Sequence, residues 1–386
     1  MIRSKSRLKW RWFAPFFVTL QDNIPYTKMK EETPGLFGQN HNNSSRDYTD
    51  EECWGKNQFN SSFPASLVAY MSFKGVKPVY LKTDIENNVI HDYISGSELY
   101  RIDPLANNAF YNFEVSFPAY DKFYTGDRET IDLVMVDSDK DIPLIGLEIK
   151  LTALPDSTTV KKTEDKYSCE IVVRPPTINF IACSICNNFK TNEDKDKLRE
   201  LLSIVPKINH WEEPEEVLPH YDKILESILS ISTYLQDKQT PLIIQPVWKT
   251  KGKKGILADD CLDIFVWSNL AVIQMCGNSE KINQNKITRP MRTIIWIYLM
   301  LLEYVSVYAQ FDYRRIVRLH SYNLANDKGY SISGTQTYKY LHCDELTHPR
   351  ISKYEIKNII LGGGQYYLSP ERRFDAVIAN SPDLFK

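Results

Sequence analysis

The chain has 386 residues, of which 42% are hydrophobic and 25% are charged, and this composition argues against a disordered or fibrous protein. The formal net charge of −2 argues against a protein that coats nucleic acid through a strongly basic surface, but it allows one local DNA-binding cleft. Seven scattered cysteines, an odd number, argue against a disulfide framework and indicate a reducing, cytoplasmic location.

The first 54 residues form an N-terminal extension with few structural signals. Residues 1–12, MIRSKSRLKWRW, are basic and are interpreted either as a solvated tail or as an arm that touches phosphate. The apolar run at 13–20 is interrupted by Pro15 and is too short to span a bilayer, so no membrane segment is predicted there. Residues 21–62 are rich in Asn, Ser, Asp and Gly and are typical of loops.

Two segments before the centre of the chain carry periodic apolar residues. FPASLVAYMSF at 63–73 predicts a helix or a strand. Residues 96–112 are predicted to be helical, with Leu99, Ile102 and Leu105 on one side.

The centre of the chain, residues 131–156, reads IDLVMVDSDKDIPLIGLEIKLTALPD. Its apolar runs at 131–136 and 144–151 are typical of strands, so we predict a β-hairpin with SDKD as its turn. With the turn centred near residue 140, Asp132 and Glu148 fall opposite each other, and Lys150 shares the face of Glu148 because side chains alternate along a strand. The hairpin is therefore predicted to gather these three side chains into one cluster.

This cluster has the composition of a cation site. Asp and Glu weaken strands, so their presence in two otherwise apolar strands indicates a functional position. Two converging carboxylates suit Mg²⁺, which prefers oxygen ligands, and a neighbouring lysine can orient water or offset charge on a phosphoryl group. The residues alone leave open a surface hairpin whose Asp132, Glu148 and Lys150 face water.

The spacing Asp-x15-Glu-x-Lys fits the loose pattern of the PD-(D/E)xK nucleases, and the surrounding sequence resembles the HindVP group of type II restriction endonucleases. The matching pieces are KNQFN (56–60), FPASL (63–67), IDPL (102–105), FYTGD (123–127), IDLV (131–134) and LEIKLTALPD (147–156). The resemblance extends from residue 55 to the C-terminus and is strongest between 98 and 160.

The resemblance implies Mg²⁺-dependent hydrolysis of double-stranded DNA at a short palindrome of the GRCGYC type. Asp132, Glu148 and the carbonyl of Ile149 would hold the cation, and Lys150 would position the attacking water. Glu98 and Glu114 are candidates for a third acid, although each can also be a surface residue. Since a palindrome suits a protein with two-fold symmetry, a homodimer is expected, and a cognate DNA methyltransferase is expected as the genetic partner.

The second half of the chain is predicted to contain helices at 196–208 and 215–235 and strands at 242–249 and 261–267. The turn KTKGKKG at 249–255 could hold phosphate or be a solvated tip, and its lysines are Lys249, Lys251, Lys253 and Lys254. The apolar stretch at 290–310 is interrupted by Glu303 and is predicted to be a buried helix, a candidate for a dimer interface, rather than a membrane span.

We therefore predict a mixed α/β (α+β) fold with a restriction-endonuclease-like core, in which helices flank a mixed β-sheet. The catalytic core is expected at 55–190, and residues 191–386 are expected to serve DNA recognition and dimerisation, either as a separate unit or continuous with the core. The predicted function is that of a type II restriction endonuclease. The alternatives are another PD-(D/E)xK nuclease, for repair or junction resolution, and a non-catalytic DNA-binding protein.

Overall fold

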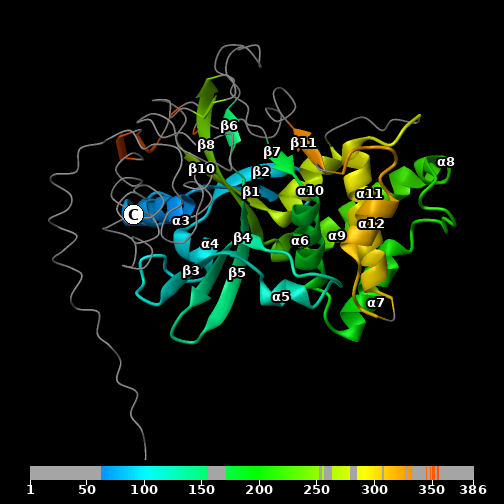
Figure 1. Ribbon diagram of the computed structural model, residues 1–386, viewed down its shortest axis with the longest axis horizontal. Coiled ribbons are helices and arrows are strands. Elements are labelled where there is room, and N and C mark those ends of the chain that lie inside the picture. The colour runs from blue at the N-terminus through cyan, green and yellow to red at the C-terminus, as the bar shows by residue number, and fades with distance from the viewer. Residues whose placement is uncertain are drawn as a thin grey trace, which may run out of the picture.

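The computed structural model describes residues 62–150, 152–154, 171–251, 254–255, 263–278, 285–306, 308–326 and 329–332, together with 345, 348, 350–352 and 354–355. Its centre is a seven-stranded mixed sheet in the order β2-β1-β10-β8-β5-β4-β3, to which β6 and β9 add by pairing with β8 (Figure 1). These strands are β1 (Val79–Thr83), β2 (Val89–Tyr93), β3 (Ala109–Val115), β4 (Ile131–Asp137), β5 (Ile142–Ile149), β6 (Thr152–Leu154), β8 (Pro241–Lys251), β9 (Lys254–Gly255) and β10 (Asp263–Ser268).

Helices cover both faces of the sheet, as the predicted fold class requires. On one face lie α3 (Ser62–Phe73) and the short α4 (Gly96–Tyr100), which contribute Leu67, Met71, Leu99 and Tyr100 to a smaller core. The helices on the other face (Figure 1) pack over the larger core. These helices are α6 (Pro175–Cys186), α9 (Tyr221–Tyr234), α10 (Asn269–Gly277) and α11 (Arg289–Tyr304).

The outer elements complete this layered arrangement. A two-stranded sheet joins β7 (Ile171–Val173) to β11 (Tyr330–Ile332). Among the described residues, the remaining α-helices are α5 (Pro118–Asp121), α7 (Asn192–Leu202), α8 (Pro214–Val217) and α12 (Tyr313–Leu319).

The C-terminal half of the chain supplies the middle of the sheet. β8 pairs in parallel with β5 and antiparallel with β10, and β10 pairs in parallel with β1. Strands from residues 241–268 therefore lie between β1 and β5, so the first and second halves of the chain share one sheet and contribute to the cores on both of its faces.

The helix predicted for 96–112 is largely wrong. α4 ends at Tyr100, and its C-cap Arg101 has a left-handed backbone with φ of 59°. Pro104 follows, and a proline disfavours helical backbone at the residue before it. The aromatic sequence AFYNFEV then forms β3, because aromatic residues favour a strand that pairs with β4.

The most apolar stretch forms α11, a buried helix as predicted, and its burial comes from other helices of the same chain without a second copy at a dimer interface. It packs against α6, α9, α10 and α12, and Trp296 in its middle is fully buried. The buried Arg292 of this helix donates to the backbone carbonyls of Ser321, Leu324 and Ala325. Within the part of the chain that the structure describes, no helix is long and apolar enough to cross a membrane.

Candidate active site

The β4–β5 hairpin brings the predicted trio together. Leu133 pairs with Leu147 and Val134 with Gly146, so the next residues outward, Asp132 and Glu148, come level across the ladder. The two strands have apolar residues on both of their faces because helices cover both sides of the sheet, which explains their nearly continuous apolar runs.

Asp132 is fixed by the backbone of the opposite strand. Its Oδ2 accepts a hydrogen bond of 2.7 Å from the N–H of Ile149. A carboxylate held by a backbone donor keeps one orientation at little entropic cost, because the donor itself is part of the sheet. Asp132 is thus positioned beside the carboxyl end of β5, where Glu148 and Lys150 lie.

Glu148 is the most buried member of the trio, with only 5% of its surface exposed. Its pKa is raised to about 7: burial is the largest cause, the Lys150 ammonium opposes the shift, and the neighbouring Asp132 carboxylate adds to it. The ammonium of Lys150 forms an ion pair with a Glu148 carboxylate oxygen. Two adjacent carboxylates in a buried place repel each other, and a bound cation would relieve that repulsion.

Gly146 makes room for the packing beneath this cluster. A Cβ at Gly146 would come within 3.0 Å of the Phe117 ring and 3.1 Å of Ile131. Gly146 is two residues before Glu148 and on the same face of β5, so a larger residue there would push against the strand that carries the carboxylate.

The segment that leads into β4 is anchored to α12. The N–H of Thr125 donates to the carbonyl of Phe311 at 2.9 Å, and the N–H of Phe311 donates to the carbonyl of Phe123 at 3.0 Å. Arg314 forms ion pairs with Asp127, at 2.9 Å, and with Glu129, three residues before Asp132. The FYTGD sequence is thus the docking segment between the hairpin and the C-terminal helices.

The two candidates for a third acid are placed differently. Glu98 forms a capping box with Ser95 on α4, and that helix packs on the sheet face opposite to the trio. The Glu114 backbone lies in β3 between Phe113, which pairs with Leu133, and Val115, which pairs with Ile131, so it is level with Asp132. Only Glu114 therefore has a backbone position next to the site.

The predicted lysine-rich turn continues the strand beside the site. β6 runs on from β5 and pairs with β8, with Leu154 opposite Lys249, and Lys251 then pairs with Lys254 of β9. Ile243 of β8 is level with Glu148, and Lys249 is six residues further along the same strand. The backbone of Lys249 is therefore about 20 Å from the level of Glu148. Lys253 and the side chains of Lys249, Lys251 and Lys254 lie outside the described residues.

Gln245 is a polar residue at this place that the sequence analysis missed. It lies on β8, is fully buried, and accepts a 2.6 Å hydrogen bond at Oε1 from the indole N–H of Trp267. The sequence LIIQPVW offers one signal, a glutamine within an otherwise apolar run, but only the pairing of β8 with β5 places it beside the trio.

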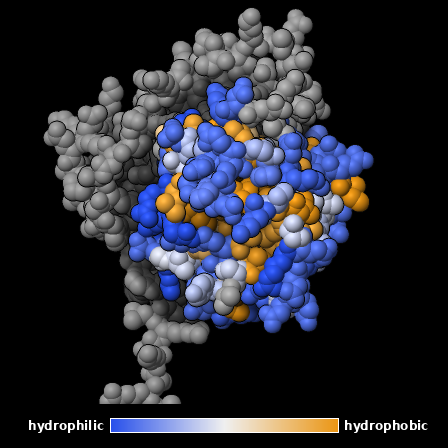
Figure 2. All heavy atoms as spheres, turned by 90° about the vertical axis from the view of Figure 1, so that its right-hand side faces the viewer, coloured by the Kyte–Doolittle hydropathy of each residue, from blue (hydrophilic) through white to orange (hydrophobic). Residues whose placement is uncertain are grey.

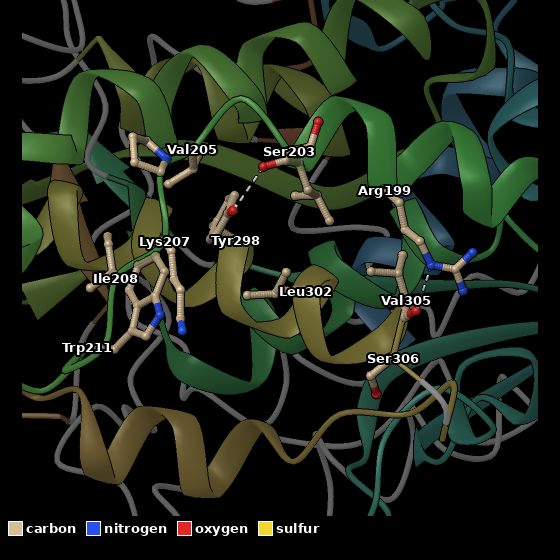
Figure 3. A pocket seen from close by; sticks show the side chains of 12 residues that line it. Arg199, Ser203, Val205, Lys207, Ile208, Trp211, Tyr298, Leu302, Val305 and Ser306 are labelled. Atoms are coloured by element: carbon tan, nitrogen blue, oxygen red, sulfur yellow. Dashed lines mark hydrogen bonds between the residues drawn. The ribbon is translucent and has the colours of Figure 1, made fainter.

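A pocket of about 480 Å³ lies elsewhere, between the end of α7 and α11 (Figure 3). It opens on the helical side of the molecule, where apolar residues show between polar ones (Figure 2). Trp211 stacks on Tyr298 along its wall, and Arg199 and Lys207 are its charged lining residues. Two serines, Ser203 and Ser306, line this pocket, but no carboxylate or histidine that could activate them or hold a cation is among its lining residues, so it does not compete with the hairpin as a hydrolytic site.

Comparisons with known proteins decide the family. A sequence model of the HindVP restriction endonuclease family matches residues 54–385. The chain belongs to this family. It is 40% identical over 355 residues to the type II restriction enzyme HgiDI of Herpetosiphon aurantiacus, a match that covers 92% of this chain and 97% of that protein.

A second relative agrees with the first. The chain is 41% identical over 358 residues to the probable type II restriction enzyme HindVP of Haemophilus influenzae, covering 92% of this chain and 95% of that protein. No solved structure matches. The family resemblance and the predicted enzyme class, a type II site-specific deoxyribonuclease, are thereby confirmed.

The raised pKa of Glu148 predicts a pH-dependent stability difference. In the unfolded chain this carboxyl ionises near its usual pKa of 4.5, whereas the folded protein retains the proton up to about pH 7. The group therefore makes wild-type stability fall as pH rises through this window, in the absence of divalent cations. Glu148→Gln removes that dependence.

We measure the melting temperature of Glu148→Gln minus that of wild type at each pH in chelated buffer. This difference should increase by a few degrees between about pH 5 and about pH 8, because only the wild type loses stability there. Glu98→Gln, at an exposed capping position, is the matched control and should show no such rise across this window. A constant difference between Glu148→Gln and wild type at all pH values would contradict the raised pKa.

Proposed function

We propose that this restriction endonuclease hydrolyses double-stranded DNA at the β4–β5 hairpin, with a divalent cation held by Asp132 and Glu148. The observation that carries the proposal is the joint placement of two carboxylates and Lys150 at the carboxyl end of β5. These ligands suit Mg²⁺, which commonly binds one or two carboxylates together with substrate phosphate. The carbonyl of Ile149 is the proposed third protein ligand.

The donor set fits a hard cation on chemical grounds. All proposed protein ligands are oxygens, and the raised pKa of Glu148 reports negative charge gathered where solvent is scarce. Among the described residues no cluster of three or more His, Cys, Asp or Glu side chains could hold a metal, so Asp132 and Glu148 need the Ile149 carbonyl, a further acid or the substrate to complete the coordination. Glu114 is the proposed third acid, because its backbone is level with Asp132.

Each residue of the trio has a separate task in this proposal. When bound, the cation lowers the pKa of water and polarises the scissile phosphate. Asp132 is held by the N–H of Ile149, so it presents its carboxylate without reorganisation. Glu148 must lose its proton for the site to be competent. Lys150 then directs its ammonium from Glu148 towards the attacking water and the phosphate, where it offsets the developing charge.

DNA binding is assigned to the β8–β9 hairpin. Its backbone extends the strand that pairs with β5 and β6, so the lysines at 249, 251, 253 and 254 follow in sequence from the site towards the region where a duplex would run. Lysines at such a place would bind phosphates, a contact that adds affinity but no sequence information. We propose a palindromic target of the GRCGYC type, with a DNA methyltransferase that protects host DNA in the same cytoplasm.

The metal requirement and the mode of cutting are tested together. Plasmid DNA incubated with the protein and Mg²⁺ or Mn²⁺ should give discrete fragments, and EDTA should stop the reaction, because the proposed ligands are all oxygens. Asp132→Asn should abolish cutting at any cation concentration. Full activity after exhaustive chelation would refute the metal site, and a smear in place of bands would favour a repair nuclease.

Lys150→Ala separates chemistry from DNA binding. Since Lys150 acts on the transition state, its loss should lower the single-turnover cleavage rate by about 10²–10³-fold or more while the cognate duplex is still shifted in a gel. Lys140→Ala is the matched control on the same hairpin, because Lys140 pairs with Asp137 at the exposed turn. It should leave the rate unchanged.

The lysines of the β8–β9 hairpin should show the reverse behaviour. Lys251→Ala should weaken binding and reduce its dependence on salt while the rate at saturating DNA persists. Near-normal cleavage by a folded Lys150→Ala protein would mean that the trio is an ordinary charged hairpin.

We also propose a homodimer on DNA, because two copies related by a two-fold axis match the symmetry of a palindrome. Analytical ultracentrifugation with a fluorescent cognate duplex should give the mass of two chains per duplex. A complex of one chain per duplex that still cuts both strands in one binding event would contradict this expectation.

A further inference from the structure

The loop between α5 and β4 lies at the end of the hairpin that carries the trio. β4 begins and β5 ends at the side of the sheet where Asp132 and Glu148 lie, so the loop enters the hairpin beside these carboxylates. The sequence TGDRE at 125–129 forms the last part of the loop. Arg128 is four residues before Asp132, so their Cα atoms are at most about 14 Å apart.

This loop has a defined conformation. The hydroxyl of Tyr124 accepts a hydrogen bond of 2.9 Å from the N–H of Glu129, which closes the loop on itself. The Glu129 carboxylate accepts hydrogen bonds from the hydroxyl of Tyr313 and from the guanidinium of Arg314, both on α12. Gly126 has φ of 95°, a backbone conformation that glycine adopts without strain. The backbone that carries Arg128 is therefore held from both sides.

The side chain of Arg128 is only weakly held within the chain. It is 75% exposed, and its Nε lies 3.5 Å from a carboxylate oxygen of Asp121, a distance at the limit of a hydrogen bond. No other ion pair of Arg128 is found within the described part of the chain. An exposed pair of this kind contributes little to stability, so Arg128 can exchange Asp121 for another anion at small cost.

Arg314 reduces the negative charge around Arg128. Its guanidinium forms ion pairs with Asp127, at 2.9 Å, and with Glu129, which are the residues on either side of Arg128. Unpaired, these two carboxylates would repel any anion that approached the loop. The pairing leaves Arg128 as the cation that the loop presents to solvent.

We propose that Arg128 binds a backbone phosphate of the DNA close to the scissile one and thereby positions the duplex at the trio. This inference rests on the proposed cleavage at the β4–β5 hairpin. Each nucleotide step advances about 3.4 Å along the duplex axis, so Arg128 falls within about four nucleotides of a phosphate bound at Asp132. A guanidinium can hold phosphate through two parallel N–H···O bonds, and such a contact fixes register without reading sequence.

A DNA duplex with one uncharged phosphate tests this contact directly. After the cut has been mapped, a methylphosphonate is placed singly at each phosphate within four nucleotides of it, and the affinity of the full-length protein is measured without divalent cation. At one of these positions the wild type should bind about tenfold more weakly. Arg128→Ala should bind the unmodified duplex about tenfold more weakly, with a salt dependence reduced by about one charge, and should lose nothing further at that position.

Arg318→Ala is the matched control, because it removes an exposed arginine of α12 and leaves the loop intact. It should retain the full methylphosphonate penalty. Arg128→Lys keeps the charge but loses the two parallel bonds, so its affinity should lie between those of wild type and Arg128→Ala. Melting temperatures should be the same for all three variants as for wild type, since both arginines are exposed.

Two results would overturn the proposal. One is Arg128→Ala with the affinity and salt dependence of wild type, which would mean that Arg128 is an ordinary solvated side chain. The other is Arg128→Ala with the same penalty as wild type at every methylphosphonate position, because the lost contact would then lie elsewhere. If Lys150→Ala cleaves normally, the proposed function fails; if it does not and no penalty depends on Arg128, only the role of Arg128 fails.

Discussion

The antiparallel pairing of β4 with β5 is the constraint on which the site depends. Its register places Asp132 level with Glu148 and brings the N–H of Ile149 to the Asp132 carboxylate. A slip by one residue would turn the side chains of a strand to the other face, so burial of both faces of the hairpin enforces the register. The energy that holds two carboxylates together is therefore supplied by apolar residues such as Leu133 and Leu147, which are fully buried.

The rest of the chain supports this hairpin from both sides of the sheet. β8 and β10 come from the C-terminal half and lie between β1 and β5. Asp263 at the start of β10 is nearly fully buried and is held by Arg350 through two hydrogen bonds of 2.6 and 2.7 Å, and Arg350 also donates to the carbonyl of Lys77. Segments far apart in sequence thus complete one sheet, and the family match correspondingly extends over residues 54–385.

The sequence allowed the local features to be predicted and left the non-local ones open. Asp132, Glu148 and Lys150 could be placed together because a hairpin with a short polar turn has a register set by its own residues. The prediction of a helix over 96–112 was wrong because it gave more weight to the periodicity of Leu99, Ile102 and Leu105 than to Pro104, which disfavours a continuing helix. Gln245 was missed because its position depends on a parallel pairing between strands almost a hundred residues apart, and no local pattern specifies such a pairing.

The central claim, that the hairpin holds the cation, is tested most directly by Fe²⁺-mediated cleavage of the protein backbone. Fe²⁺ substituted for Mg²⁺ and treated with peroxide and ascorbate produces short-lived radicals that cut the polypeptide next to the ion. Mass spectrometry of the fragments should show cuts at Asp132 and around Glu148 to Lys150, suppressed by excess Mg²⁺ and absent in Asp132→Asn. Mg²⁺-competed cuts confined to other parts of the chain would contradict the account.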